Sequence, residues 1–222
     1  INNVEGDRNT AIGHRSLYTM NPSGDVDTYN TAVGYYSGFA ITTGERNTLI
    51  GGQAGDALTD ADYNVALGES ALSADTLGSR SVAIGRAALS AQNFTTATNT
   101  YNTAVGNNAG LLVTTGIRNS LFGGEAGEAL TDADDNIAIG YQALTADTLG
   151  SRSVAIGNNA LDAQNFTTAT NTYNVAVGYA AGGSVTTGIN NTLIGGLAGD
   201  AFTLGKNNVA LGYSTLSTDT KG

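Results

Sequence analysis

The side chains that most often carry catalysis are scarce in this sequence. It contains one histidine, His14, and no cysteine among its 222 residues. A serine hydrolase needs a histidine that is held beside its nucleophile, and no later part of the chain repeats His14. The glycine-rich turns never match the GxxxxGK[ST] pattern of a phosphate-binding loop. We therefore interpret His14 as a turn residue and predict that the protein is not an enzyme.

Acidic residues gather in two similar turns where a metal ion could bind. The segment LTDADYN contains Asp60 and Asp62, and LTDADDN contains Asp132, Asp134 and Asp135. Ca²⁺ takes six to eight oxygen ligands, so either turn would supply only part of a site. The alternative is a solvated turn that keeps β-structure soluble and discourages edge pairing. We predict no required cofactor, and Asp60, Asp62, Asp132 and Asp134 are the candidates for Ca²⁺.

Three connections are longer than the others and contain aromatic residues suited to recognition. They span residues 18–30, 90–102 and 162–174. Phe94 and Phe166 stand among Asn and Thr residues, and Tyr101 and Tyr173 lie near the ends of the same segments. Loops on a rigid scaffold often carry recognition, and an aromatic ring beside amides and hydroxyls suits a sugar. We predict these four residues as contacts for a cell-surface glycan or protein receptor. The alternative is that each Phe packs under its own loop or against another chain.

All of these residues belong to a repeat that runs through the chain. The pattern [Asn/Ser]–x–[Ala/Leu]–x–Gly begins at Asn9, Asn30, Asn47, Asn64, Ser81, Asn102, Asn119, Asn136, Ser153, Asn174, Asn191 and Asn208. Three coils of period 17 and one of period 21 make a superrepeat of period 72. Its complete copies, 31–102 and 103–174, are identical at 52 of 72 positions, and partial copies fill 1–30 and 175–222. We expect one repeat region over residues 1–222.

The residue pattern within each coil predicts one turn of a solenoid. We number positions from the Asn or Ser, which is position 0. Position +1 is Thr, Val, Ile or Ser, position +3 is Val, Ile, Leu or Phe, and position +4 is always Gly. This alternation indicates a short strand that ends in a turn. We expect a second short strand at the small residue of position +7 and the Leu or Gly of position +8. The prediction is an all-β, parallel β-solenoid of about 12 rungs, with about 4.8 Å between rungs.

Stacked rungs place equivalent residues in columns. Position −1 reads Arg8, Tyr29, Arg46, Tyr63, Arg80, Tyr101, Arg118, Asp135, Arg152 and Tyr173, followed by two Asn residues. Arg on an aromatic face is favourable, and an Asp between two Arg residues is favourable by charge. We predict one continuous surface stack at position −1. The Asn and Ser residues at position 0 should form an amide ladder.

The strand pattern also predicts association between chains. Positions +1 and +3 face one way and +2 faces the other. If +3 faces the interior, the Ala and Leu residues at +2 form an exposed apolar strip. Strips of that kind mark interfaces, so we predict an oligomer. Terminal solenoid coils need caps, and we expect adjoining segments of a longer parent fibre at both ends.

Charge and hydropathy exclude several partners. The formal net charge is −10, with nine Lys and Arg residues. This disfavours nucleic acid as a partner, because its phosphate backbone is negatively charged. No apolar run approaches the roughly 20 residues of a membrane-spanning helix, so we expect no membrane insertion. Without cysteine the chain has no disulfide framework.

The sequence SVAIG at 81–85 and 153–157, with NTAVG, NVALG and NIAIG elsewhere, resembles the head repeats of trimeric autotransporter adhesins. Similar repeats occur in trimeric phage tail fibres. The resemblance implies a left-handed parallel β-roll, a homotrimer, and an extracellular place on a virion or a bacterial cell surface. The family's typical rung is shorter than the coils of this chain, so the loops here are longer.

These observations predict a structural and adhesive fibre segment that mediates attachment to a host or cell surface. We favour a phage tail fibre, and the alternative is the head of a bacterial trimeric surface adhesin. An ice-binding solenoid is a weaker alternative, because Thr occupies position +1 in only five coils. A polysaccharide-cleaving fibre would need a pair of carboxylates in a cleft, and no acidic pair stands outside the repeats.

Overall fold

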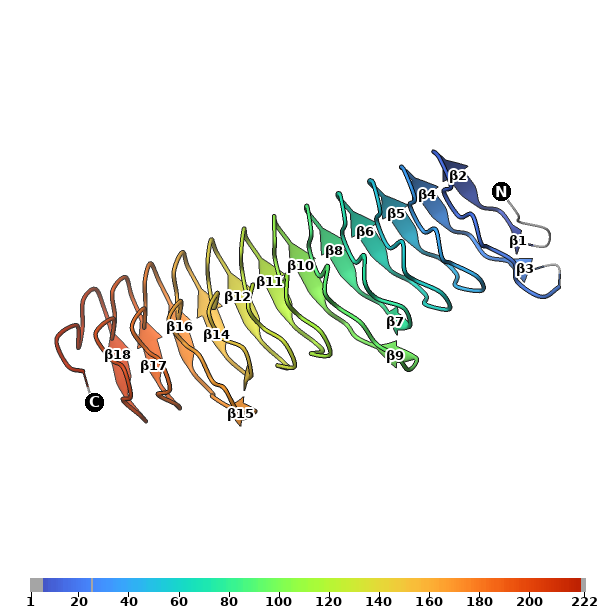
Figure 1. Ribbon diagram of the computed structural model, residues 1–222. Helices are drawn as coiled ribbons and strands as arrows, with labels where there is room; N and C mark the ends of the chain where they lie inside the picture. Colours follow the sequence, from blue (N-terminus) through green and yellow to red (C-terminus); the bar gives the residue numbers. More distant parts are fainter. Residues whose placement is uncertain (1–5, 25, 221–222) are drawn as a thin grey trace. The chain divides into compact units, whose positions relative to one another are not determined.

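The computed structural model describes residues 6–24 and 26–220, and all their regular secondary structure is β-strand (Figure 1). The chain divides into two compact units, residues 1–108 and 109–222. Six consecutive coils of each unit contribute one short strand each, and these strands are parallel. The prediction of an all-β, parallel β-solenoid of about 12 turns is therefore confirmed. Asp25, in the first long connection, lies outside the described residues.

The first unit stacks six strands in strict register. They are β2 (Thr10–Ile12), β4 (Thr31–Val33), β5 (Thr48–Ile50), β6 (Val65–Leu67), β8 (Val82–Ile84) and β10 (Thr103–Val105). Every strand begins at position +1 and ends at +3, so each residue pairs with its equivalent in the next coil. Ala32, for example, pairs with Leu49, which pairs with Ala66. The sequence repeat is thus the register of the sheet.

The second unit repeats this arrangement. Its strands are β11 (Ser120–Phe122), β12 (Ile137–Ile139), β14 (Val154–Ile156), β16 (Val175–Val177), β17 (Thr192–Ile194) and β18 (Val209–Leu211). Pairing again joins equivalent positions, as in Ala155 with Ala176. Two superrepeat copies therefore fold by the same local rules.

Short second strands occur only around the three long connections of the described chain. They are the pairs β1 (Gly6–Asp7) with β3 (Val26–Asp27), β7 (Gly78–Ser79) with β9 (Thr98–Asn99), and β13 (Gly150–Ser151) with β15 (Thr170–Asn171). Each pair is parallel. Each pair joins a segment near the end of a long connection to the segment of the chain one coil earlier.

The second strand that we expected at positions +7 and +8 is absent from the described coils, so that prediction was wrong. The residues at +6 and +8 have positive φ, such as 56° at Arg15 and 47° at Leu17. Strand geometry needs a strongly negative φ, so this segment is a chain of tight turns. Consecutive turns still bond to each other, as in Gly38 N–H to Ala54 O at 3.0 Å.

The invariant Gly at +4 is required by the backbone at the corner that follows each strand. Gly51 has a φ of +139°, a region that residues with a side chain rarely adopt. A Cβ there would lie 2.4 Å from the carbonyl oxygen of Gly68 in the next coil. Both the turn and the close stacking therefore exclude a side chain.

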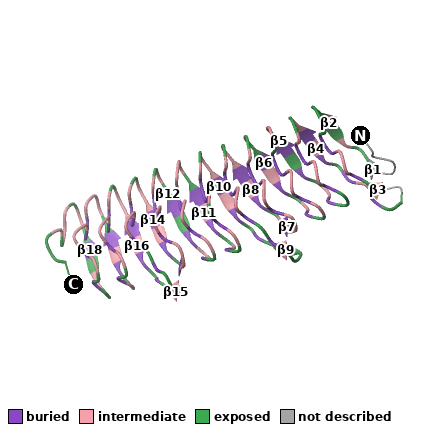
Figure 2. Cartoon of the chain, viewed as in Figure 1, coloured by how far each residue is buried: buried purple, intermediate pink, exposed green. Residues whose placement is uncertain are grey.

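The +2 side chains point into the core, which contradicts our assignment of the strand faces. Ala32, Leu49 and Ala66 are fully buried, whereas their neighbours at +1 and +3 are half-buried or exposed. Figure 2 shows buried segments beside half-buried and exposed ones along the coils. The interior is narrow, because the small residues at +7, such as Ala54, are buried opposite the strand. Ala or Leu occupies +2, and the Val, Ile, Leu and Phe residues at +3 lie on the outer face of the same strands.

The alternation of Leu and Gly at position +8 follows from this narrow core. Leu49 lies between two +8 glycines, and a Cβ at Gly38 or Gly55 would approach its methyl carbons to 2.9 or 2.8 Å. In the next coil the sizes are reversed, with Ala66 at +2 and Leu72 at +8, both fully buried. A leucine at +2 therefore requires glycine at +8 in its own coil and in the preceding coil.

Candidate functional site

A column of buried side-chain amides runs through each unit at position 0. The backbone N–H of Asn47 donates to Oδ1 of Asn30 at 2.9 Å, and that of Asn64 donates to Oδ1 of Asn47 at 2.9 Å. The side-chain Nδ2 of Asn64 donates to the carbonyl oxygen of Gly78 at 2.9 Å. The predicted amide ladder is confirmed within each unit, and its polar groups are paired as burial requires.

The ladder changes composition where Ser replaces Asn. The amide of Gln92, from the long connection, donates to Ser81 Oγ at 2.8 Å. Its Oε1 accepts from Asn102 Nδ2 at 2.8 Å. Ser81 also bonds to Thr100 Oγ1 at 2.6 Å. Gln92 therefore takes the place in the ladder that a longer residue at position 81 would fill.

A buried aspartate completes this network. Asp75 Oδ1 accepts the backbone N–H of Gly78 at 3.0 Å and that of Phe94 at 3.1 Å, and Oδ2 accepts Gln92 Nε2 at 2.5 Å. Burial raises the pKa of the Asp75 carboxyl group, and the hydrogen bonds from Gln92, Phe94 and Gly78 partly oppose that rise. The second unit repeats the network around Asp147, whose pKa is raised by burial in the same way.

Our sequence reading did not identify these polar residues. The sequence does contain a signal for them, because a change at position 0 is accompanied by a change in the connection that follows. Among the twelve coils, Ser stands at position 0 only at Ser81 and Ser153, and only the connections after these two contain Gln. A small residue at position 0 that is followed by a long amide at position +11 indicates that one side chain substitutes for the other.

The two phenylalanines that we predicted as receptor contacts are buried. Phe94 and Phe166 are 7 % and 6 % exposed, and the backbone N–H of each binds the buried aspartate of its unit. The long connection folds over its own aromatic ring, since the ring gains more from leaving water than from lying on the surface. The proposed sugar contacts at Phe94 and Phe166 were therefore wrong. Tyr101 and Tyr173 are exposed.

The position −1 side chains from Arg8 to Arg80 contact one another in sequence on the surface of the first unit. The predicted stack does not continue to Tyr101, because the Nε of Arg80 donates to Asn99 Oδ1 at 3.0 Å. In the first unit the guanidinium carbon of Arg46 lies 5.7 Å from the ring centroid of Tyr29 and 5.4 Å from that of Tyr63. Arg80 lies 4.9 Å from Tyr63, and Arg8 bonds to the hydroxyl of Tyr29. The backbone at this position has positive φ throughout, from 51° to 65°.

The second unit places charge in the same column. Arg118 pairs with Asp135, and the Nε of Arg152 lies 3.8 Å from Asp135 Oδ2. The hydrogen bond from Arg118 holds the pKa of the Asp135 carboxyl below its usual value, and Arg152 acts in the same direction. Arg152 also lies 5.8 Å from the ring centroid of Tyr173. Such exposed contacts stabilise a protein by at most about 1 kcal/mol each.

The acidic turns use their oxygens within the fold. Asp62 Oδ1 accepts the backbone N–H of Glu45 at 2.8 Å, and Asp134 Oδ1 accepts that of Ile117 at 2.8 Å. Asp60 and Asp132 each accept a threonine hydroxyl from the preceding coil. Within residues 6–24 and 26–220, no three acidic, histidine or cysteine side chains gather closely enough to hold a metal ion.

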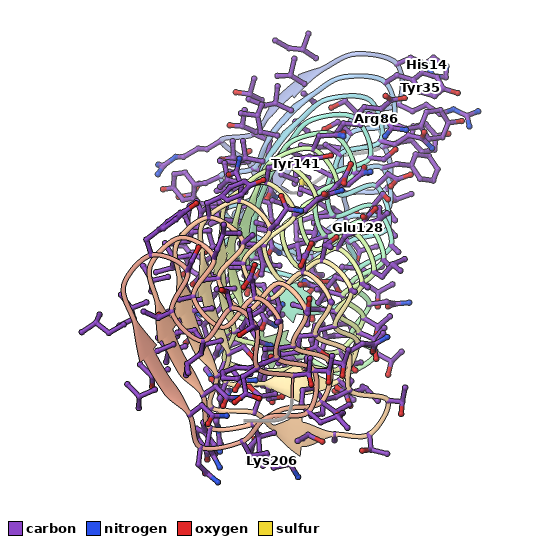
Figure 3. All side chains as sticks on the ribbon, turned by 90° about the vertical axis from the view of Figure 1, so that its left-hand side faces the viewer. His14, Tyr35, Arg86, Glu128, Tyr141 and Lys206 are labelled. Carbon is purple, nitrogen blue, oxygen red and sulfur yellow. The ribbon has the colours of Figure 1, made fainter. Side chains whose placement is uncertain are left out.

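His14 belongs to an exposed aromatic cluster that our sequence reading missed. Its ring stacks on that of Tyr35 with 5.5 Å between centroids and 12° between planes (Figure 3). The ring centroids of Tyr35 and Tyr36 lie 4.4 Å apart, and those of Tyr36 and Phe39 lie 4.8 Å apart. The available signal was aromatic residues at +5, +6 and +9 of consecutive coils.

A column of aliphatic side chains covers the outer strand face of each unit. The exposed members at +3 include Ile12, Ile50 and Leu67 in the first unit and Ile139 and Ile194 in the second. Residues at +3 of adjacent paired strands, such as Ile50 and Leu67, lie about 4.8 Å apart. No cavity opens among the described residues, so these flat surfaces are the candidates for contact.

Comparison with known proteins gives no further guide. The chain matches no protein-family model, no curated protein and no solved structure. None of the described residues belongs to a helix long and apolar enough to cross a membrane.

Proposed function

We propose that this chain is a structural segment of a homotrimeric attachment fibre, of a phage tail fibre or of a bacterial surface adhesin. The observation that carries the proposal is the exposed aliphatic column at +3 on the strand face of each unit. Contiguous apolar patches above a few hundred Å² usually mark an interface. Side-by-side association of identical chains would cover the same column in each copy.

The arrangement of the coils supports a scaffolding role. Each coil contacts its neighbours through backbone ladders, buried amides and small core residues, so the stack is built from local contacts. Such a stack can present a surface at a distance without a catalytic centre. The number three, the extracellular place and attachment itself rest on the resemblance of the repeat to adhesin heads and tail fibres.

Light scattering on the purified chain tests the association. We expect a mass of three times 22.4 kDa. The variant Ile50→Lys/Ile139→Lys places one charge in the aliphatic column of each unit and should shift the mass toward 22.4 kDa. A buried, unpaired lysine at an interface is costly, whereas a lysine on the exposed strand face of a single chain is tolerated.

The matched control is Leu112→Lys/Leu204→Lys, which changes two exposed leucines away from the strand face. This control should keep the parent mass, and circular dichroism should show that both variants keep the parent fold. A parent chain that is monomeric would contradict the proposed trimer. A trimer that survives in the Ile50→Lys/Ile139→Lys variant would show that another surface holds the copies together.

A further inference from the structure

The differences between the two complete superrepeats concentrate on one edge of the coils. Residues 31–102 and 103–174 differ at 20 positions, and 13 of these fall at positions +5 to +10, which we call the outer turn. The long connections 91–102 and 163–174 are identical. The scaffold is thus kept while the outer turn varies, which is how repeat proteins carry a binding surface.

The exposed aromatic cluster is built entirely from the outer turns of the first two coils. Its rings are those of His14, Tyr18, Tyr35, Tyr36 and Phe39, and Tyr35 is 58 % exposed. Tyr18 stacks on Phe39 with 5.6 Å between centroids and 6° between planes. The rings therefore form one continuous surface across two coils rather than separate side chains.

An arginine adds hydrogen-bond donors to this surface. The guanidinium carbon of Arg15 lies 5.4 Å from the ring centroids of both Tyr18 and Tyr36. Its Nη1 bonds to the hydroxyl of Tyr36. A guanidinium has five N–H donors, and Arg15 is exposed, so donors remain for a ligand beside the rings.

The fold does not need this cluster. In the coil that starts at Ser81 the same three positions hold Arg86, Ala87 and Ser90, with the same strand and turns. In the coil that starts at Asn174 a tyrosine at +5, Tyr179, is followed by Ala180 at +6. Since equivalent coils fold without aromatic neighbours, packing of the solenoid does not account for the cluster.

We propose that the cluster of His14, Arg15, Tyr18, Tyr35, Tyr36 and Phe39 is a binding platform for an oligosaccharide. A pyranose ring has an apolar C–H face that packs on a tyrosine ring, and its hydroxyls pair with arginine and tyrosine groups at the edge. This inference rests on the attachment role proposed above and names the class of receptor for it.

The shape and size of the surface favour a saccharide over other ligands. No cavity opens in the described part of the chain, so a ligand must lie flat rather than enter a pocket as most small molecules do. The cluster has six side chains, far fewer than the roughly 20–30 residues that each partner contributes to a stable protein complex. A net charge of −10 opposes nucleic acid.

Binding to an array of neutral and carboxylate-bearing oligosaccharides tests the platform, followed by titration calorimetry with the best probe. Tyr35→Ala removes the exposed ring that contacts both His14 and Tyr36, and it should weaken binding at least tenfold. Tyr179→Ala is the matched control, because Tyr179 occupies the same position +5, is 65 % exposed and has Ala180 beside it. The control should bind as the parent does.

Three results would overturn the platform. They are an array without a binding oligosaccharide, unchanged binding by Tyr35→Ala, and equal losses for Tyr35→Ala and Tyr179→Ala. If Tyr35→Ala instead lowers the mass in solution, the cluster is a contact between copies of the chain and the glycan inference fails. A trimer that binds no oligosaccharide would remove this inference alone, whereas a monomeric parent chain would contradict the fibre proposal.

Discussion

Asp75 and Asp147 show how a single residue controls the long connection of each unit. Each carboxylate accepts hydrogen bonds from two backbone N–H groups and one glutamine amide, so it anchors the first part of the connection to the preceding coil. An isolated carboxylate of this kind is expensive to bury. The protonated acid is cheaper, and this is why burial raises the pKa of both groups.

This pKa shift predicts that the two aspartates make the chain more stable in acid. A folded-state pKa above the unfolded value means that the folded chain binds the proton more tightly. The stabilisation is complete below the ordinary aspartate pKa of about 4 and is lost as the pH rises through the raised value. The melting temperature of the parent should therefore fall, relative to that of Asp75→Asn/Asp147→Asn, as the pH rises from about 4 to neutral.

Thermal melts of parent and variant over this pH range measure the difference directly. The comparison with Asp75→Asn/Asp147→Asn removes the contributions of surface groups such as Asp135, whose lowered pKa acts in the opposite direction. Asparagine keeps an oxygen for the two backbone N–H groups but does not titrate. Parallel melting curves of parent and variant at every pH would contradict the prediction.

At the scale of the coil, the interior is divided between positions +2 and +8. Leu49→Ala should leave a cavity and cost about 2–5 kcal/mol. Gly55→Leu should also destabilise the protein, since a Cβ there would lie 2.8 Å from Leu49 and 2.8 Å from Leu58. The backbone itself accepts leucine, because Leu72 stands at +8 with a φ of 54°, close to the 56° of Gly55.

The double variant Leu49→Ala/Gly55→Leu should therefore lose less stability than the sum of its two single variants. It places at +2 and +8 the residue types of Ala66 and Leu72 in the next coil, while Leu58 remains at +11, where the next coil has Asp75. Urea unfolding of the three variants gives the interaction free energy, which we expect to exceed about 1 kcal/mol in the favourable direction. Additive losses would show that the two positions do not share core volume.

The repeat predicted the coils well because their spacing is a direct record of the register. It did not predict which strand face is buried, because positions +2 and +3 are both apolar. The alternation separates the two faces of the strand but does not show which of them faces the core. The contacts of Leu49 show that the +2 face is buried, because its side chain packs against Gly38 and Gly55 inside the solenoid. Non-glycine residues with positive φ, such as Leu72 and Tyr63, carry no signal in the sequence.

The candidate site was harder to predict for a related reason. Phe94 lies among polar residues in a long connection and has the sequence context of an exposed ring, yet it is buried above Asp75. Conversely, the local sequence presents His14 as a lone turn residue, because Tyr35 belongs to the next coil and becomes its neighbour only through stacking. Contacts between coils decide both cases, and they follow from the register rather than from local sequence.

For the whole molecule, the exposed +3 columns predict that stability depends on protein concentration. If identical chains associate through these columns, mass action favours the folded trimer over unfolded chains. For a trimer, a tenfold rise in concentration adds roughly 0.9 kcal/mol per chain, which raises the melting temperature of a chain this long by about 2–4 °C. Calorimetric melts of the parent over a hundredfold concentration range measure this slope.

The variant Ile50→Lys/Ile139→Lys should have the same melting temperature at all concentrations, and Leu112→Lys/Leu204→Lys should keep the concentration dependence of the parent. A flat response of the parent itself would mean that the aliphatic columns stay in contact with water and that each chain is stable alone.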